Sequence, residues 1–200
     1  MKKKIIKSDN IANANLDGWL NNHAIVIENE KVKEIINQSN IPEKGSFEVI
    51  DFGRSYAIPG IIETHAHLQF SATPDAYEIY FEENEEQRHQ RAINNAETAL
   101  MSGVTSLRDL GSPNNLIFPI RKDIINGKIK GPNIYPTGTP ITIKDGHCWF
   151  FGATVNNLDD IFSVIDNQLS LGATHIKMMA SGGNFTPSSN PRISQFSLKT

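Results

Sequence analysis

The pattern of apolar and polar positions changes near residue 56. Before that point, short apolar runs alternate with polar turns, as in "HAIVIENEKVKEII", where β-branched residues alternate and "ENEK" is typical of a hairpin turn. A further short strand, "SFEVIDFG", ends at Gly53. We therefore predict a small β-sandwich-type domain over residues 1–56.

From Ala57 to Thr200, strand-like segments alternate with helical ones. The predicted strands are "IIETHAHL", "VTSLRDLG", "NIYPTGTPIT" and "THIKMMA". Predicted helices cover about 74–102, 114–126 and 157–171, the last capped by Asn156 or Asn157 and closed by Gly172. A long loop then leads to Ser197, the predicted N-cap of another helix.

This alternation predicts parallel strands joined by right-handed crossovers, an α/β fold. An open doubly wound sheet and a (β/α)8 barrel both begin in this way. No glycine-rich phosphate fingerprint follows the first strand, which argues against a nucleotide-binding domain. Residues 57–200 supply four β/α units, about half of a barrel that typically needs about 250 residues.

Composition narrows the class of partner. The formal net charge is −3, and the basic cluster Lys2–Lys4 stands at the terminus, so no nucleic-acid partner is expected. The first residues lack the apolar region of a secretory signal, and no apolar run reaches the about 18 residues of a membrane span. The single cysteine, Cys148, suits a reducing compartment. We expect a cytoplasmic protein that has no membrane partner.

Two histidines, His65 and His67, lie at the end of the first predicted barrel strand. Side chains at positions i and i+2 of a strand project to the same side, and at the carboxyl end of a barrel strand this side can face the active-site mouth. Two convergent imidazoles are natural ligands for zinc or a similar divalent ion. A structural, hydrogen-bonded pair is the alternative, but the position at the strand end favours metal ligation.

Lys177 lies within the apolar segment "ATHIKMMASGG". Lysines are rarely buried without a partner, so this one either extends to solvent from a strand end or reaches the same mouth as His65 and His67. His175, two residues deeper on the same face, is expected to fill a layer or to support the site from behind.

Four motifs in order resemble the amidohydrolase superfamily, in particular its imidazolonepropionase and Xaa-Pro dipeptidase-like branch. They are "IPGIIETHAHL", "GVTSLRDLG", "TPITIKDGH" and "HIKMMASGG" followed by "PRISQF". The resemblance covers nearly the whole chain and implies the first half of a TIM barrel at 57–200. It also implies hydrolysis of a C–N bond in an amide, cyclic amide or dipeptide by a metal-activated hydroxide.

The resemblance implies a role for each matching residue. His65 and His67 correspond to metal ligands, and Lys177 to a lysine that in many members forms a CO2-derived carbamate bridging two ions, expected to be Zn2+. An apolar strand favours the neutral amine that this reaction needs. His147 corresponds to a catalytic histidine near the substrate, which polarises the scissile carbonyl or holds a substrate carboxylate. A surface histidine is the alternative.

Other residues carry weaker expectations. Arg192 and Gln195 are candidate substrate contacts, with a surface role equally open. Arg108 and Asp109 are expected to form a structural or supporting contact at the end of the second strand. Cys148 has no evident base and is not expected to act as a nucleophile.

The chain also departs from the family pattern. Complete members carry two further histidine ligands and a catalytic aspartate on later strands, and none of these precedes Thr200. His23 and His89 lie in the β-domain and in a polar helix and cannot replace them. We therefore expect a hydrolase of small molecules whose isolated 200-residue chain is inactive, and which forms a homo-oligomer or joins a missing carboxyl-terminal half. The alternative is a truncated, non-catalytic half-barrel that acts as a remnant or a binding module.

Overall fold

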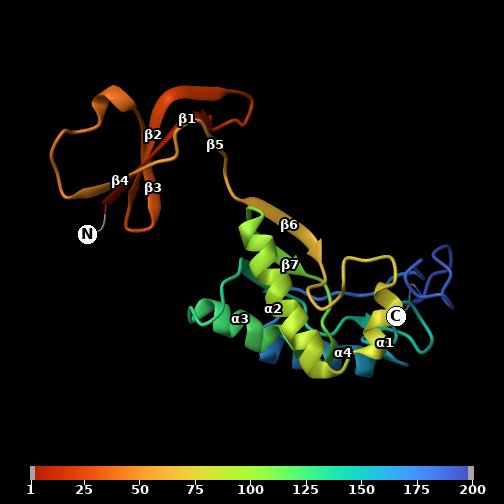
Figure 1. Cartoon of the computed structure of the whole chain (residues 1–200). Helices are drawn as coiled ribbons and strands as arrows, with labels where there is room; N and C mark the ends of the chain where they lie inside the picture. The colour runs from red at the N-terminus through yellow and green to blue at the C-terminus, as the bar shows by residue number, and fades with distance from the viewer. Residues whose placement is uncertain (1–2, 198–200) are drawn as a thin grey trace. The chain divides into compact units, whose positions relative to one another are not determined.

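The computed structural model describes residues 3–197. The chain divides into two compact units, Met1–Pro59 and Gly60–Thr200, whereas the sequence analysis places the boundary after residue 56 (Figure 1). Among the described residues, no helix has both the length and the apolar character needed to cross a membrane.

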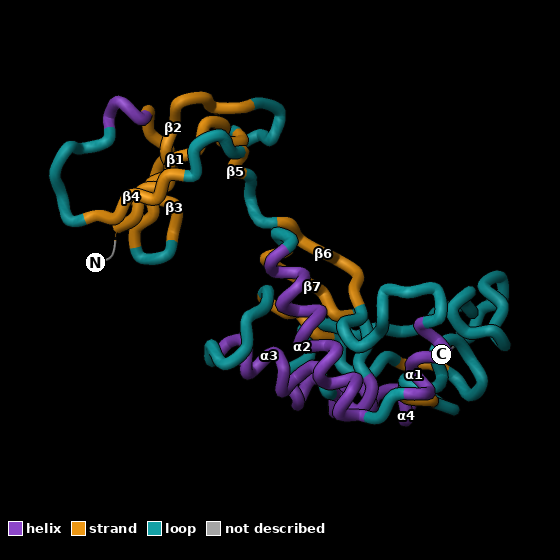
Figure 2. The backbone as a smooth tube through the Cα atoms, in the orientation of Figure 1, coloured by secondary structure: helices purple, strands orange, loops and turns teal. Residues whose placement is uncertain are grey.

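The first unit is built around one five-stranded sheet. Its strands are β1 (Lys3–Ala12), β2 (Trp19–Glu28), β3 (Lys31–Asn37), β4 (Phe47–Asp51) and β5 (Tyr56–Ala57), with the short helix η1 (Gln38–Asn40) after β3 (Figure 2). The order is β3-β2-β1-β4, with β5 also beside β1. The predicted hairpin joins β2 to β3 through Asn29 and Glu30, which adopt φ values of 52° and 64°. A two-residue hairpin turn requires such left-handed conformations.

The second unit contains the parallel sheet that the alternation predicts. Its strands are β6 (Ile61–Ala66), β7 (Val104–Asp109) and β8 (Asn133–Pro136), in that order. Helix α2 (Glu85–Met101) connects β6 to β7, and α3 (Ile117–Ile125) connects β7 to β8. The buried core packs these helices against one face of the sheet, through Leu107, Ile134, Ala92, Ala96, Ile117 and Ile120.

The predicted helix over 74–102 is two helices in the structure. Helix α1 (Ala76–Glu82) ends before Asn84, which begins α2 with a capping box. The Asn84 side chain accepts from the Gln87 N–H at 2.9 Å, and the Gln87 side chain accepts from the Asn84 N–H at 2.9 Å. These bonds stabilise a new helix start where the apolar pattern alone suggests continuity.

The predicted helix over 114–126 begins later, at the start of α3. The short helix η2 (Pro113–Asn115) precedes it, and Pro119 lies within the first turn of α3. The first N–H groups of a helix have no partner within the helix, so a proline is tolerated there.

The third and fourth predicted strands are shorter than expected. The third is divided into β8 and β9 (Ile141–Thr142), and β9 pairs in parallel with β10 (Ala153–Thr154). The predicted strand "THIKMMA" is reduced to one parallel bridge between Ile141 and Met178. Helix α4 (Leu158–Leu171) begins at the Asn157 cap and ends at Gly172, as predicted. The helix predicted after Ser197 lies outside the described residues.

Candidate metal and substrate site

The two histidines of the HxH motif come together at the carboxyl end of β6. His65 is within the strand and His67 directly follows it, and their ring centroids are 5.4 Å apart. Nδ1 of His67 lies 3.2 Å from the carbonyl oxygen of Gly111. A carbonyl can only accept, so this bond places the proton on Nδ1 and leaves the Nε2 lone pair free to bind a metal ion.

The surroundings of both imidazoles favour their neutral form. Burial lowers the pKa of His67 to about 4, with smaller contributions from the charges of His65 and Lys177. Burial and then the Lys177 charge also lower the pKa of His65. A metal ligand must be unprotonated, so both side chains are in the required state at neutral pH.

Asp109, at the end of β7, forms hydrogen bonds that hold the segment following His67 in place. Its fully buried carboxylate accepts from the Leu68 N–H at 2.9 Å and from the Gly111 N–H at 3.3 Å. Burial raises the pKa of Asp109 to about 7, and these two hydrogen bonds oppose the increase. Asp109 therefore makes a supporting contact at the end of the second strand. Arg108, its neighbour, is exposed.

Lys177 lies close enough to the histidines to affect their protonation. Its side chain is half-buried, and its carbonyl accepts from the Ile141 N–H at 2.8 Å. The Lys177 charge contributes to lowering the pKa of His65, His67 and His147, in each case after the larger effect of burial. The structure thus places the rings of His65 and His67 side by side, with the charge of Lys177 acting on both of them and on His147.

His147 is held from two sides by residues far along the chain. Its backbone N–H donates to Oε1 of Gln195 at 2.5 Å, and its Nδ1 lies 3.2 Å from Oγ1 of Thr186. A Cβ atom at Gly183 would overlap the His147 ring, so glycine permits this close approach. The sequence analysis identifies Gln195 only as a substrate contact and does not identify Thr186, whose single hydroxyl carries no local pattern.

Arg192 and Cys148, also considered from the sequence, differ in their exposure to solvent. Arg192 is exposed, and its backbone N–H donates to the Asn190 side chain at 2.9 Å, so its predicted substrate contact stays a prediction. Cys148 is buried, and burial raises the pKa of its thiol to about 11. A thiol with so high a pKa is a poor nucleophile at neutral pH.

A cavity of about 330 Å³ opens beside His67 and His147. Three phenylalanines and an alanine form its apolar wall: Phe70, Phe151, Phe185 and Ala76. We call it the aromatic cavity. The sequence analysis does not predict it, because its rings come from three separate segments that only the fold brings together.

Comparison with known proteins assigns the chain to a family. The model of the Amidohydrolase family matches residues 56–191. The chain belongs to the amidohydrolase family. This match includes all four residues at the mouth of the candidate site.

Individual relatives support this assignment. Ochratoxinase of Aspergillus niger is 26% identical over 207 residues, covering 89% of this chain and 42% of that protein, and its crystal structure matches with a TM-score of 0.77. A prolidase in complex with N-methylphosphonate-L-proline has a TM-score of 0.83 at 22% identity, covering 98% of this chain and 50% of the other. A Xaa-Pro dipeptidase with bound methionine has a TM-score of 0.82 at 20% identity, with coverage of 98% and 51%. The likeness to the last two shows the fold, and this chain spans about half the length of these solved structures.

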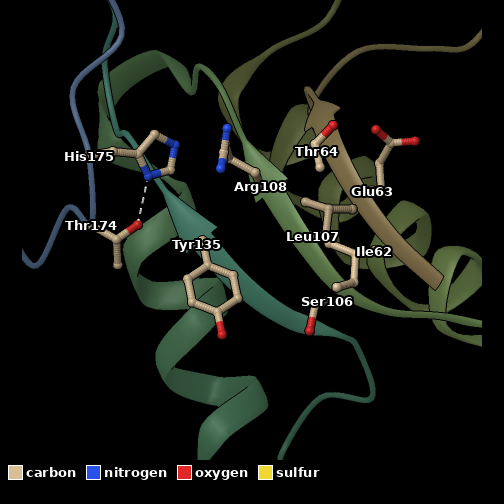
Figure 3. Close-up of a pocket in the computed structure, with 9 residues that line it drawn as sticks. All are labelled: Ile62, Glu63, Thr64, Ser106, Leu107, Arg108, Tyr135, Thr174 and His175. Atoms are coloured by element: carbon tan, nitrogen blue, oxygen red, sulfur yellow. Dashed lines mark hydrogen bonds between the residues drawn. The ribbon is translucent and has the colours of Figure 1, made fainter. Parts of the chain in front are cut away.

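A second cavity of this amidohydrolase-family chain, of about 500 Å³, lies on the β6-β7-β8 sheet (Figure 3). Ser106, Arg108 and Tyr135 contribute to its lining and alternate along their strands with the core residues Leu107 and Ile134. They therefore project from the face opposite to α2 and α3.

His175 also lines this second cavity. Its Nδ1 lies 2.8 Å from the Thr174 hydroxyl oxygen, and its buried Nε2 has no hydrogen-bond partner (Figure 3). Burial and the charge of Arg108 lower the pKa of His175. This histidine therefore lines the cavity on the open sheet face, and its role as a layer-filling or supporting group stays a prediction.

The side chains of His65 and His67 can bind a metal ion, but they supply only part of the ligands that such an ion needs. His65 and His67 offer two neutral imidazoles, whereas in residues 3–197 no group of three or more His, Cys, Asp or Glu side chains is arranged to hold a metal. Lys177 is the additional group at this mouth, and as an ammonium it would repel a cation. Conversion of its amine to a carbamate would remove that conflict.

Proposed function

We propose that this chain supplies metal-binding and carbonyl-binding groups to a hydrolase that cleaves an amide C–N bond in a small molecule. The family match and the hydrolase names of its relatives support this proposal. One structural observation carries it: the rings of His65 and His67 lie 5.4 Å apart at the end of β6, and His67 and His147 line the same cavity. The charge of Lys177 contributes, after burial, to lowering the pKa of all three histidines, which supports a place for it beside them.

His65, His67 and a carbamate on Lys177 are the groups proposed to hold divalent metal, expected to be zinc and, in the complete ligand shell, two ions. The free Nε2 of His67 is one donor. In the carbamate, the lysine nitrogen bonds to the carbon of CO2 and releases a proton, which leaves an anionic group with two oxygen donors. A divalent ion bound there supplies Lewis acidity and lowers the pKa of water.

His147 is proposed to orient the scissile carbonyl. The Thr186 oxygen accepts from the Cys148 N–H at 2.8 Å, so its own hydrogen can be donated to Nδ1 of His147. The neutral imidazole then carries its proton on Nε2, which lies 3.4 Å from Sγ of Cys148 and would exchange this weak sulfur contact for a substrate carbonyl oxygen. A donor already in place when charge develops on that oxygen stabilises the transition state.

Hydrolysis is proposed to need groups beyond those that this chain's described residues provide. They contain no third protein ligand of the His, Cys, Asp or Glu type at the site. This chain also covers about half of each of the solved structures named above. We propose that a further polypeptide segment completes the ligand shell. The 200-residue chain alone is then expected to bind metal but not to cleave amides.

The test is zinc retention by the 200-residue chain, measured by elemental analysis after extensive dialysis. The matched variants are His65→Ala/His67→Ala and His89→Ala, because His89 is a half-buried histidine on α2, away from the motif. We expect the wild-type chain and His89→Ala to retain zinc and the double variant to lose it. Equal retention by all three proteins would contradict the proposed site.

A further inference from the structure

The aromatic cavity lies directly beside the groups proposed to act on the substrate. His67 and His147 contribute to its lining, together with Phe70, Phe151 and Phe185. We propose that this cavity binds an uncharged aromatic or bulky apolar side chain of the amide substrate, and so determines its class. The inference rests on the proposed function, because it concerns the substrate of the same site.

The wall of the cavity is formed by rings already packed against one another. The Phe70 centroid lies 5.1 Å from that of Phe151 and 5.2 Å from that of Phe185, both with edge-on geometry. Behind this wall, Tyr80 stacks on Phe70 at 5.3 Å. Edge-to-face and offset arrangements are the favourable ones for aromatic pairs, so another ring can extend the same packing.

The lining of the cavity discriminates against charge. None of its residues is Asp, Glu, Lys or Arg. The hydroxyl groups of Ser71 and Thr73 lie 2.9 Å from each other, and the Cys148 thiol is neutral because burial raises its pKa. A charged side chain would lose its hydration among these residues, and the lining offers it no ion-pair partner, since Lys177 acts on His67, His147 and Cys148 from outside the lining.

The size and position of the cavity agree with an aromatic group attached to an amide. An apolar cavity of about 150 Å³ is enough to bind benzene, and this cavity has a volume of about 330 Å³. The His67 ring lies 5.9 Å from both Phe70 and Phe151. A ring held by these phenylalanines therefore has its amide at the imidazole end, where His147 can reach the carbonyl.

The test compares the binding of three probes by saturation-transfer NMR and calorimetry on the 200-residue chain. The probes are N-acetyl-phenylalanine amide, N-acetyl-alanine amide and N-acetyl-aspartate amide. We expect the phenylalanine probe to bind at least about tenfold more tightly than the other two, because its ring leaves water. Equal affinity of the phenylalanine and alanine probes would overturn the inference.

Two matched variants locate the binding. Phe185→Ala removes a ring of the cavity wall, whereas Phe81→Ala removes an exposed ring that does not line the cavity. We expect Phe185→Ala to reduce the preference for the phenylalanine probe about three- to tenfold and Phe81→Ala to leave it unchanged. A preference that persists in Phe185→Ala would refute the assignment. Ala76→Phe, which fills the cavity, should abolish binding if it folds.

Failure of this inference can be separated from failure of the proposed function. The affinities are measured with a chelator and again with zinc, because ring binding uses the cavity wall and not the metal. Selective binding by a chain that retains no zinc would keep the aromatic site and reject the metal site. Zinc retention without selective binding of the phenylalanine probe would keep the metal site and reject the aromatic site.

Discussion

At the residue scale, the site depends on contacts that control protonation and orientation. Asp109 connects the N–H groups of Leu68 and Gly111, and the Gly111 carbonyl orients His67. Lys177 adds a positive charge beside the imidazoles. The contributions of Asp109 and Lys177 can each be altered by one substitution that keeps side-chain size similar.

Replacing Lys177 by glutamine tests its charge. The charge of the ammonium group contributes to the low pKa of His65, so Lys177→Gln should raise that pKa. The measurement is an NMR titration of the imidazole signals. His175 provides the internal control, since burial and Arg108, not Lys177, lower its pKa. The titration is done without metal or added CO2, so that no carbamate forms, and an unchanged or lower pKa of His65 in the variant would contradict a cationic Lys177 beside it.

Replacing Asp109 by asparagine tests its buried carboxyl group. Burial raises the pKa of Asp109 from 3.8 to about 7, so between these values the native chain holds a proton that the unfolded chain has lost. Its contribution to stability is complete below the ordinary pKa and is lost as pH rises through about 7.

The wild-type free energy of unfolding should therefore fall relative to that of Asp109→Asn as pH rises from acid to mildly alkaline values. We expect this difference in the free energy of unfolding to change by up to about 4 kcal/mol. Denaturant unfolding of both proteins at several pH values measures it. Because His67 is present in both proteins, its own titration cancels in the difference. A difference that does not change with pH would show that the carboxyl group is not strained by burial.

The sequence predicts the proposed ligand and catalytic residues better than the residues that hold them in place. His65 and His67 are recognisable because they end a strand, and His147 and Lys177 because they lie in motifs that match a family. Thr186 has no such signal, since its partner, His147, is 39 residues away in the chain. Such a hydrogen bond is set by the folded loops and not by any local pattern.

At the element scale, local signals explain most of the helices and fail where two elements share one pattern. The Asn157 cap and Gly172, whose φ is 99°, define both ends of α4 as predicted. The α1–α2 boundary was predicted wrongly because the polar helical stretch runs on through Asn84. The fourth strand was also wrong, since one bridge to Ile141 replaces an extended ladder.

The capping box offers a test of the α2 boundary. Asn84→Ala removes the acceptor for the Gln87 N–H and should lower the free energy of unfolding by about 1 kcal/mol. Asn94→Ala is the control, because Asn94 is exposed within the same helix and its side chain accepts from the Gln90 side chain at 2.9 Å. Alanine favours the helix interior, so this control should be neutral or slightly stabilising. Equal losses in both variants would contradict the cap.

At the scale of the whole molecule, the second unit leaves one face of its sheet open. Ile62 and Tyr135 are 68% and 47% exposed and both line the 500 Å³ cavity. The opposite face is covered by α2 and α3. Apolar side chains gathered on an open sheet face favour association with another polypeptide. We propose a second copy of the chain as that partner.

Self-association can be measured by light scattering coupled to gel filtration. We expect the wild-type chain to form oligomers that Ile62→Lys disrupts, because a charge on the open face opposes its burial. Ile125→Lys is the matched control, since Ile125 is equally exposed, at 68%, but lies at the end of α3. A wild-type chain that remains monomeric at high concentration would contradict association through this face.

The most direct test of the account is X-ray absorption spectroscopy at the zinc edge of the zinc-loaded chain. We expect scattering from two imidazole rings, at the Zn–N distance of about 2.0 Å typical of histidine ligands, and its loss in His65→Ala/His67→Ala. A spectrum without imidazole scattering, or one that the double substitution leaves unchanged, would contradict the metal site on which the proposed function depends.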